Sequence, residues 1–167
     1  MLVAIVPICV IVQKKAFRTL GMIDAGSEIT LMRADFAKHV GLTGTPDSLH
    51  LGSCLDSTLI QTQLIEFDIC SIDGRNKFRV EEGIVVSSIK GSERRINWPI
   101  EKFRWNHLAD LELPAIDSGK VNVLIGQDVE GAHSRLAVRK SSLKGMPRAE
   151  LTDFGWIVVG RIPAEIL

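Results

Sequence analysis

The sequence has few cysteines. They are Cys9, Cys54 and Cys70, an odd number with no Cys-x-x-Cys pair and no histidine at metal-ligand spacing. This pattern argues against a zinc site and is typical of reduced thiols in an intracellular setting. We therefore expect no zinc site at these residues.

An excess of charge of either sign is also missing. Lysine and arginine together number 20, and aspartate and glutamate together number 20. No overall field therefore attracts the protein to nucleic acid or to an anionic membrane. We interpret one local basic cluster as a solvated face rather than a nucleic-acid site. Its members are Arg135, Arg139, Lys140, Lys144 and Arg148.

The sequence lacks an apolar run long enough to cross a membrane. Residues 2–12 are apolar, but a membrane-spanning helix needs ~20 such residues. No basic residue stands before this run inside the sequence, and Lys14 and Lys15 follow it, which is not the order of a signal peptide. Its β-branched residues instead predict a buried strand, and we expect no membrane partner.

The composition that is present is that of one folded domain. The chain has 167 residues, of which 46% are apolar and 24% charged. This balance argues against wholesale disorder, and the length suits a single domain over 1–167 but not two full lobes.

Strands dominate the predicted secondary structure. Two apolar runs separated by Gln13-Lys14-Lys15 predict a hairpin, and the turn signal Asp73-Gly74 separates two further runs. The predicted strands cover residues 3–12, 16–23, 59–71, 77–87, 121–125 and 154–160.

The remaining segments predict one helix and two irregular regions. Apolar residues at helical spacing predict a helix over 33–40 that ends at Gly41. Small polar residues over 48–57 predict a mobile hairpin tip. Residues from about 88 to 120 predict a long connection, and we expect its tryptophans to serve packing rather than ligand binding. The sequence has three tryptophans, Trp98, Trp105 and Trp156.

The candidate active site is Asp24-Ala25-Gly26, which follows directly on a predicted apolar strand. An aspartate at the end of a rigid strand, followed by a glycine turn, is one half of the carboxylate pair of an aspartic peptidase. Such a pair shares one proton, so that one carboxylate activates water while the other protonates the carbonyl oxygen. Val123-Leu124-Ile125-Gly126 could supply the apolar support beneath this turn.

These motifs and their order resemble a retropepsin-like aspartic peptidase, and more narrowly the peptidase domain of Pao-type (BEL/Pao) retrotransposon polyproteins. The resemblance covers nearly the whole chain. Its features are Met22-Ile23-Asp24-x-Gly26-Ser27, Val40-Gly41-Leu42, Trp98-Pro99, Trp105-Asn106-His107-Leu108, Val123-Leu124-Ile125-Gly126-x-Asp128 and Thr152-x-Phe154-Gly155-Trp156.

The resemblance implies a closed, mostly β barrel with one or two short helices that works as a homodimer. For such an enzyme we expect no metal ion and no cofactor. Asp24 of each copy would be catalytic, with Ala25, Gly26 and Ser27 in the turn and Ile125 and Gly126 as its buttress. A flap near Leu51 to Ser57 would place Gly52 and Ser53 against a peptide or polyprotein substrate. The protein would act in the cytoplasm or in a retroelement particle.

The chain departs from the family at Ala25, where serine or threonine is usual. That hydroxyl would bond across the dimer axis, and its loss costs on the order of 1 kcal/mol. A catalytically silent dimerisation or peptide-binding module is therefore the alternative function. A ligand-binding β-barrel is a third interpretation.

Several other residues allow a plain structural reading. Asp117-Ser118-Gly119 matches the family's Asp-Ser/Thr-Gly motif more closely than Asp24-Ala25-Gly26 does. Its neighbouring residues nevertheless predict an ordinary turn in a loop. Glu28 either contacts substrate or faces solvent. The four histidines show no spacing of a nucleophile and its base, so we expect them on the surface or satisfied in the core. They are His39, His50, His107 and His133.

Overall fold

The structure is a computed structural model that describes residues 1–53, 56–91 and 95–163. Strands form 43% of it and helices 12%, which confirms the predicted mostly β fold. In chain order the strands are β1 (Ile5–Val12), β2 (Lys15–Ile23), β3 (Leu31–Arg33), β4 (Thr45–Ser53), β5 (Asp56–Cys70), β6 (Lys77–Val86), β7 (Val121–Ile125), β8 (Ala137–Arg139), β9 (Arg148–Thr152) and β10 (Gly155–Val159).

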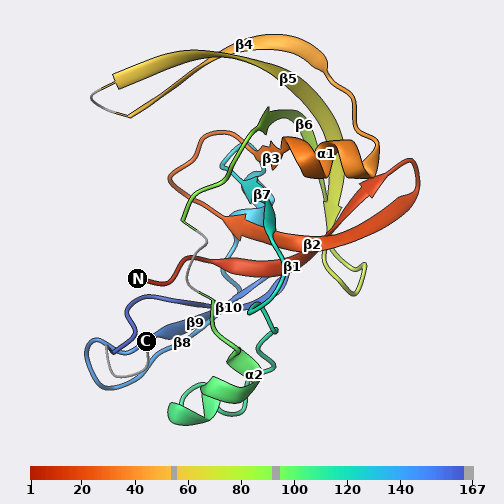
Figure 1. The fold of residues 1–167 in the computed structure, drawn as a ribbon. Coiled ribbons are helices and arrows are strands. Elements are labelled where there is room, and N and C mark those ends of the chain that lie inside the picture. Colours follow the sequence, from red (N-terminus) through yellow and green to blue (C-terminus); the bar gives the residue numbers. More distant parts are fainter. Residues whose placement is uncertain (54–55, 92–94, 164–167) are drawn as a thin grey trace.

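Six strands close into a barrel, as predicted. Their order is β1-β2-β7-β3-β6-β5, and β5 pairs back onto β1 to complete the ring. β4 pairs with β5 outside the ring, so that these two strands form a long hairpin that extends away from the barrel (Figure 1). This hairpin therefore projects from the closed barrel.

The hairpin of β1 and β2 begins the fold, and Asp24 directly follows its second strand. The two strands pair along their full length, from Val12 opposite Lys15 to Ile5 opposite Met22. Gln13 and Lys14 form the turn with φ of 50° and 65°. Left-handed backbone at both turn positions matches the twist of a hairpin, although such turns usually contain asparagine or glycine.

Apolar side chains fill the interior of the barrel. Alternate residues of each strand point inward, and Ile8, Val10 and Ile69 have no exposed surface. Phe67 and Ile125 join the same buried cluster. This packed interior holds the strands in register, because a shift by one residue would turn the apolar side chains outward.

The connection between β6 and β7 is pinned by its tryptophans, as predicted. Trp98 is 1% exposed, and its ring lies 5.9 Å from that of the buried Trp105. Both belong to a second buried cluster, against which Trp156 packs. The connection is more regular than predicted, because it contains helix α2 (Trp98–Glu101) and the 3-10 turn η1 (Lys102–Arg104).

Both helices are short. α1 (Ala34–Val40) buries Phe36, Ala37 and Val40, and it ends as predicted at Gly41, whose φ is 80°. The Leu42 N–H donates to the Ala37 carbonyl at 2.9 Å and closes the last turn. None of the helices in the described residues is long and apolar enough to span a bilayer.

The predicted hairpin tip over 48–57 is too long. β4 continues to Ser53 and β5 begins at Asp56, with these two residues paired, so the end of the hairpin falls at 54–55, outside the described residues. The small polar residues in this stretch occupy strand positions because the two strands satisfy each other's backbone groups.

A second sheet near the carboxyl end was only partly predicted. It has the order β10-β9-β8, and the sequence pattern predicted β10 alone. β8 and β9 were missed because residues of the basic cluster interrupt their apolar alternation. Arg135 and Arg148 pair with Glu150, and Arg139 pairs with Asp110, at 2.8–3.4 Å. These ion pairs agree with a solvated face.

Candidate functional site

The candidate site is the loop of residues 24–30, which leaves β2 and returns to the barrel as β3. β7 lies between these two strands, parallel to β2 and antiparallel to β3. The loop therefore passes over the end of β7, where Ile23 pairs with Ile125. This topology brings together two segments about a hundred residues apart in the sequence.

Asp24 begins the loop with its backbone fixed. Its N–H donates to the Ile125 carbonyl at 3.0 Å, and its own carbonyl accepts the Ser27 N–H at 3.2 Å. The Gly26 N–H donates to carboxylate Oδ1 at 2.9 Å. Asp24 is half-buried, while Ala25 and Gly26 are exposed. The turn thus presents a carboxylate at the surface, above a rigid strand.

Ser27 closes the second half of the loop. Its hydroxyl donates to the Ile29 carbonyl at 2.7 Å and lies 3.4 Å from the Ile29 N–H. A serine side chain that bonds backbone two residues ahead stabilises a turn. Ser27 therefore stabilises the conformation of the loop in this chain.

Gly126 forms the crossing beneath the loop. A Cβ at this position would lie 2.3 Å from the Ile29 carbonyl oxygen and 2.5 Å from its carbon. Real Cβ atoms do not approach backbone so closely, so a larger residue would push the two segments apart. The predicted role of Gly126 as the glycine that lets two segments cross agrees with this geometry.

Thr30 and Asp128 lock the crossing, and sequence reasoning gave neither of them a role. Thr30 is fully buried; its hydroxyl accepts the Gly126 N–H at 3.1 Å and donates to Asp128 Oδ1 at 2.7 Å. Asp128 Oδ2 accepts the Thr30 N–H at 3.2 Å. The only signal was the position of Asp128 two residues after the glycine.

Gln127 holds the exposed part of the loop. Its N–H donates to the Ser27 carbonyl at 2.8 Å, and its side-chain Nε2 donates to the Ala25 carbonyl at 3.3 Å. Three consecutive residues, 126–128, thus bind the loop at three separate points. Gln127 and Asp128 both reach it from the same short segment after β7.

His133 differs from the expected surface or fully satisfied histidine. Its Nε2 lies 2.7 Å from the Gly126 carbonyl, which can only accept, so Nε2 carries the proton. Nδ1 is buried without a hydrogen-bond partner in the described part of the chain. His133 therefore holds the segment 126–128, which in turn binds the loop of residues 24–30.

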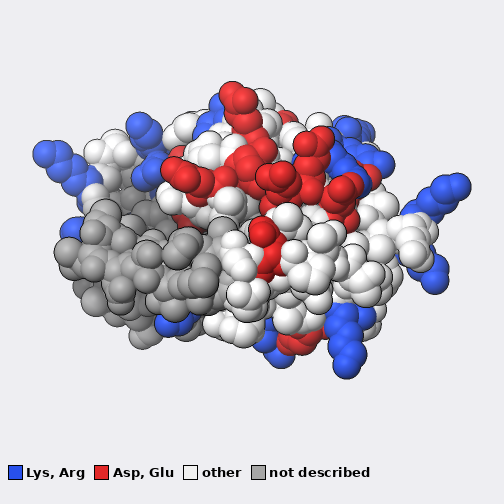
Figure 2. All heavy atoms as spheres, turned by 90° about the horizontal axis from the view of Figure 1, so that it is seen from above, with Lys and Arg blue, Asp and Glu red and all other residues white. Residues whose placement is uncertain are grey.

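The other predicted site residues lie apart from this network. Glu28 is exposed and lines a cavity of about 570 Å³ together with Glu81, Glu82 and Asp128. Acidic side chains gather on the face seen from above in Figure 2. Gly52 and Ser53 lie in β4, and the surroundings of their side chains fall outside the described residues.

Asp117-Ser118-Gly119 is a turn, as predicted. The triplet lies before β7, its residues are exposed, and Gly119 has a φ of 91°. Asp117 accepts a hydrogen bond from the Asn97 side chain at 3.1 Å. Unlike Asp24, it does not follow a buried strand.

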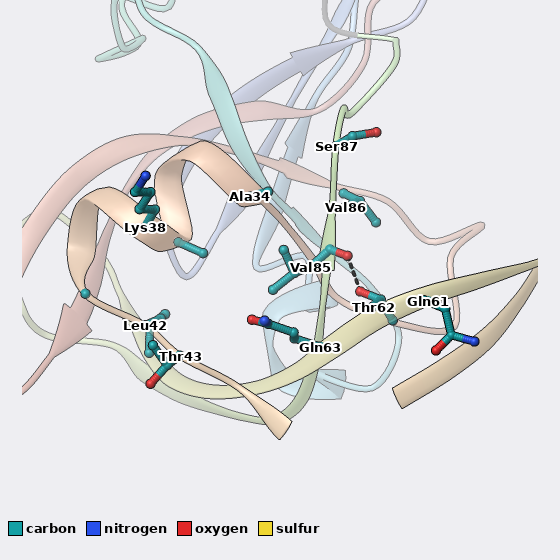
Figure 3. Close-up of a pocket in the computed structure, with 12 residues that line it drawn as sticks. Ala34, Lys38, Leu42, Thr43, Gln61, Thr62, Gln63, Val85, Val86 and Ser87 are labelled. Atoms are coloured by element: carbon teal, nitrogen blue, oxygen red, sulfur yellow. Dashed lines mark hydrogen bonds between the residues drawn. The ribbon is translucent and has the colours of Figure 1, made fainter. Parts of the chain in front are cut away.

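A cavity of about 560 Å³ lies between α1 and the strands β5 and β6 (Figure 3). Ala37 and Leu42 line it from the helix side and Gln63 and Val85 from the strands. The Thr62 hydroxyl donates to the Val85 carbonyl at its edge. None of the predicted site residues lines this cavity.

Among the residues that the structure describes, no group of three or more histidine, cysteine or acidic side chains is placed to hold a metal ion. Scans against family models, curated proteins and solved structures each found no match to this chain. The fold defines the chain as a closed β-barrel protein, and the Asp24 turn follows one of the barrel strands.

We predict that Thr30→Val destabilises the protein by about 1–3 kcal/mol. The substitution keeps the shape of the side chain but leaves the buried Gly126 N–H without a partner, whereas the exposed Asp128 carboxylate can bond water instead. Urea unfolding of the exposed-site variant Thr43→Val serves as the control. Equal stability of the two variants would show that the Thr30 hydroxyl does not hold the crossing.

Proposed function

We propose that this chain is a retropepsin-like aspartic endopeptidase from a Pao-type (BEL/Pao) retrotransposon polyprotein. The observation that carries the proposal is the Asp24 turn. A carboxylate at the end of a barrel strand receives the Gly26 N–H and rests on a segment whose Gly126 permits close crossing. Such rigid support is what a catalytic carboxylate needs.

The proposed active site contains two copies of the chain. Peptide hydrolysis by this route needs two carboxylates close enough to share a proton. Asp24 directly follows a buried barrel strand. Asp73 makes a similar turn with the Arg75 N–H, but it lies in the hairpin between β5 and β6, and Asp117 lies in a loop before β7. A twofold axis beside the exposed residues Ala25 and Gly26 would bring two Asp24 carboxylates together.

The chemistry would be direct attack by water. Two carboxylates in close proximity cannot both ionise, so one holds a proton while the other remains charged. The charged carboxylate takes a proton from the water as it attacks the peptide carbonyl, and the protonated one donates to the carbonyl oxygen. No covalent intermediate with the enzyme forms on this route.

The hairpin of β4 and β5 is the candidate flap. It extends beyond the barrel, above the connection from β2 to β3 in Figure 1, and its end falls in the predicted flap segment. In a dimer, two such hairpins would cover an extended substrate. Gly52 and Ser53 remain predictions for residues that contact the peptide.

The alternative is a catalytically silent module that dimerises or binds peptide. Ala25 favours this alternative, because its methyl group cannot make the hydrogen bond that serine or threonine would make across the dimer axis. The third interpretation, a ligand-binding barrel, is disfavoured by the interior of the barrel. Residues such as Ile8, Val10 and Phe67, each at most 1% exposed, fill the space that a ligand would need.

The proposal predicts that the purified protein at high concentration cleaves a mixed peptide library near pH 5. Asp24→Asn and the aspartic-peptidase inhibitor pepstatin should each abolish cleavage, because both remove the function of the shared-proton pair. Asp117→Asn is the matched control and should cleave as the wild type does. An absence of cleavage by a demonstrably dimeric wild type would favour the silent module.

The rate of cleavage should peak at mildly acidic pH. One Asp24 must be protonated and the other ionised, so activity falls when both are protonated and again when both are ionised. The measurement is the initial rate for one identified peptide across roughly pH 4 to 8. A flat profile would contradict the shared-proton mechanism.

Ala25→Thr should strengthen the dimer about fivefold or more. The new hydroxyl would supply one hydrogen bond across the axis, which is typically about 1 kcal/mol. Sedimentation at several concentrations gives the dimer Kd, with Ala16→Thr, at an exposed strand position, as the control. If both variants have the wild-type Kd, Ala25 does not lie at the dimer axis.

A further inference from the structure

Cys9 and Cys70 face each other across the contact that closes the barrel. They are directly opposite in the antiparallel pairing of β1 with β5, and both are free thiols. This pairing spans only Cys9 to Ile11 on β1 and Asp68 to Cys70 on β5. The two thiols therefore lie at one end of the short pairing that closes the ring.

Both cysteines belong to the outer surface of the barrel. Their neighbours Ile8, Val10 and Ile69 point into the core, and side chains alternate along a strand. Cys9 is half-buried, whereas Cys70 is 6% exposed and its Sγ lies 3.1 Å from the Ser71 carbonyl. Cys9 is thus the thiol that solvent reaches first.

The register sets a distance that a disulfide can span. Directly opposed residues of an antiparallel pair have Cα atoms about 4.5 or 5.5 Å apart, depending on the hydrogen-bonding position. Both values fall within the roughly 4.4–6.8 Å found for disulfides. Side chains of opposed residues also lie on the same face of the sheet, as a disulfide between them requires.

A positive side chain flanks the pair on each side. Arg18 of β2 stands opposite Cys9, and Lys77 of β6 stands opposite Cys70, so the four residues form one row across four strands. Burial and the neighbouring Cys70 nevertheless raise the pKa of the Cys9 thiol, with Arg18 acting in the opposite direction. The Cys9 thiol therefore rests mainly in the protonated form and reacts slowly at neutral pH.

We propose that Cys9 and Cys70 are a modification site that exchanges with low-molecular-weight disulfides and closes a reversible bridge between β1 and β5. The Cys9 thiolate attacks oxidised glutathione, forms a mixed disulfide and releases one glutathione thiolate. The Cys70 thiolate then attacks the Cys9 sulfur and expels the second glutathione. The two protein thiols lose two electrons and two protons, and one oxidised glutathione becomes two reduced ones.

The bridge would fasten the closure of the barrel. β5 also carries the projecting hairpin, whose base is the pair of Thr45 and Leu64, so a bond at Cys70 would anchor the barrel end of that strand to β1. A crosslink that closes a long loop restricts the unfolded chain, and we expect the melting temperature to rise by roughly 5–15 °C. This inference does not rest on peptidase activity.

The test is disulfide mapping of the folded, full-length Cys54→Ser variant after incubation with oxidised glutathione. Free thiols are alkylated, the protein is digested without reduction, and linked peptides are identified by mass. We expect the Cys9–Cys70 peptide pair as the main product, with a much lower yield in urea. In the additional variant Cys70→Ser, glutathione should remain on Cys9 because no second thiol displaces it.

Separate glutathione adducts or two alkylated thiols in the folded Cys54→Ser protein would overturn the proposal. If this variant does not fold, the same mapping applies to the wild type, where any bridge to Cys54 is distinguished by its peptide mass. A wild-type product without the Cys9–Cys70 pair would equally reject the site.

Discussion

The structure depends on the crossing of two backbone segments at Gly126. The loop that follows Asp24 passes so close above this glycine that a Cβ would lie 2.3 Å from the Ile29 carbonyl oxygen. This contact is possible because β7 lies between β2 and β3 and pairs with both. The position of Asp24 is therefore set by strand pairing in the barrel and not by the loop alone.

Hydrogen bonds hold the two crossing segments together. The buried Thr30 hydroxyl both accepts from Gly126 and donates to Asp128, so it needs both segments to be satisfied. Loss of either partner would leave a buried polar group unpaired, which costs more than the bond contributes on average. The network explains how a loop with exposed residues at Ala25 and Gly26 is tied to the barrel at Gly126, Gln127 and Asp128.

Much of this arrangement could be predicted from local patterns. The hairpin before Asp24, the helix ending at Gly41 and the strand over 121–125 each have apolar periodicity bounded by turn residues, and all three are confirmed. The glycine at 126 could be identified because a close crossing of two backbone segments requires it. Thr30 could not, because its role depends on Asp128, nearly a hundred residues away, and single-sequence patterns carry no information on such pairs. β8 and β9 were missed because their apolar alternation is interrupted by charged residues that find partners only in the folded chain.

The central claim is that Asp24 residues from two chains form one site, and the stoichiometry of inhibitor binding tests this claim most directly. Calorimetric titration of the purified protein with pepstatin, at a concentration where sedimentation shows a dimer, measures the number of inhibitor molecules bound per chain. The account predicts one inhibitor for every two chains and no binding to the Asp24→Asn variant. One inhibitor for each chain, or equal binding to the variant, would contradict a site shared across a dimer.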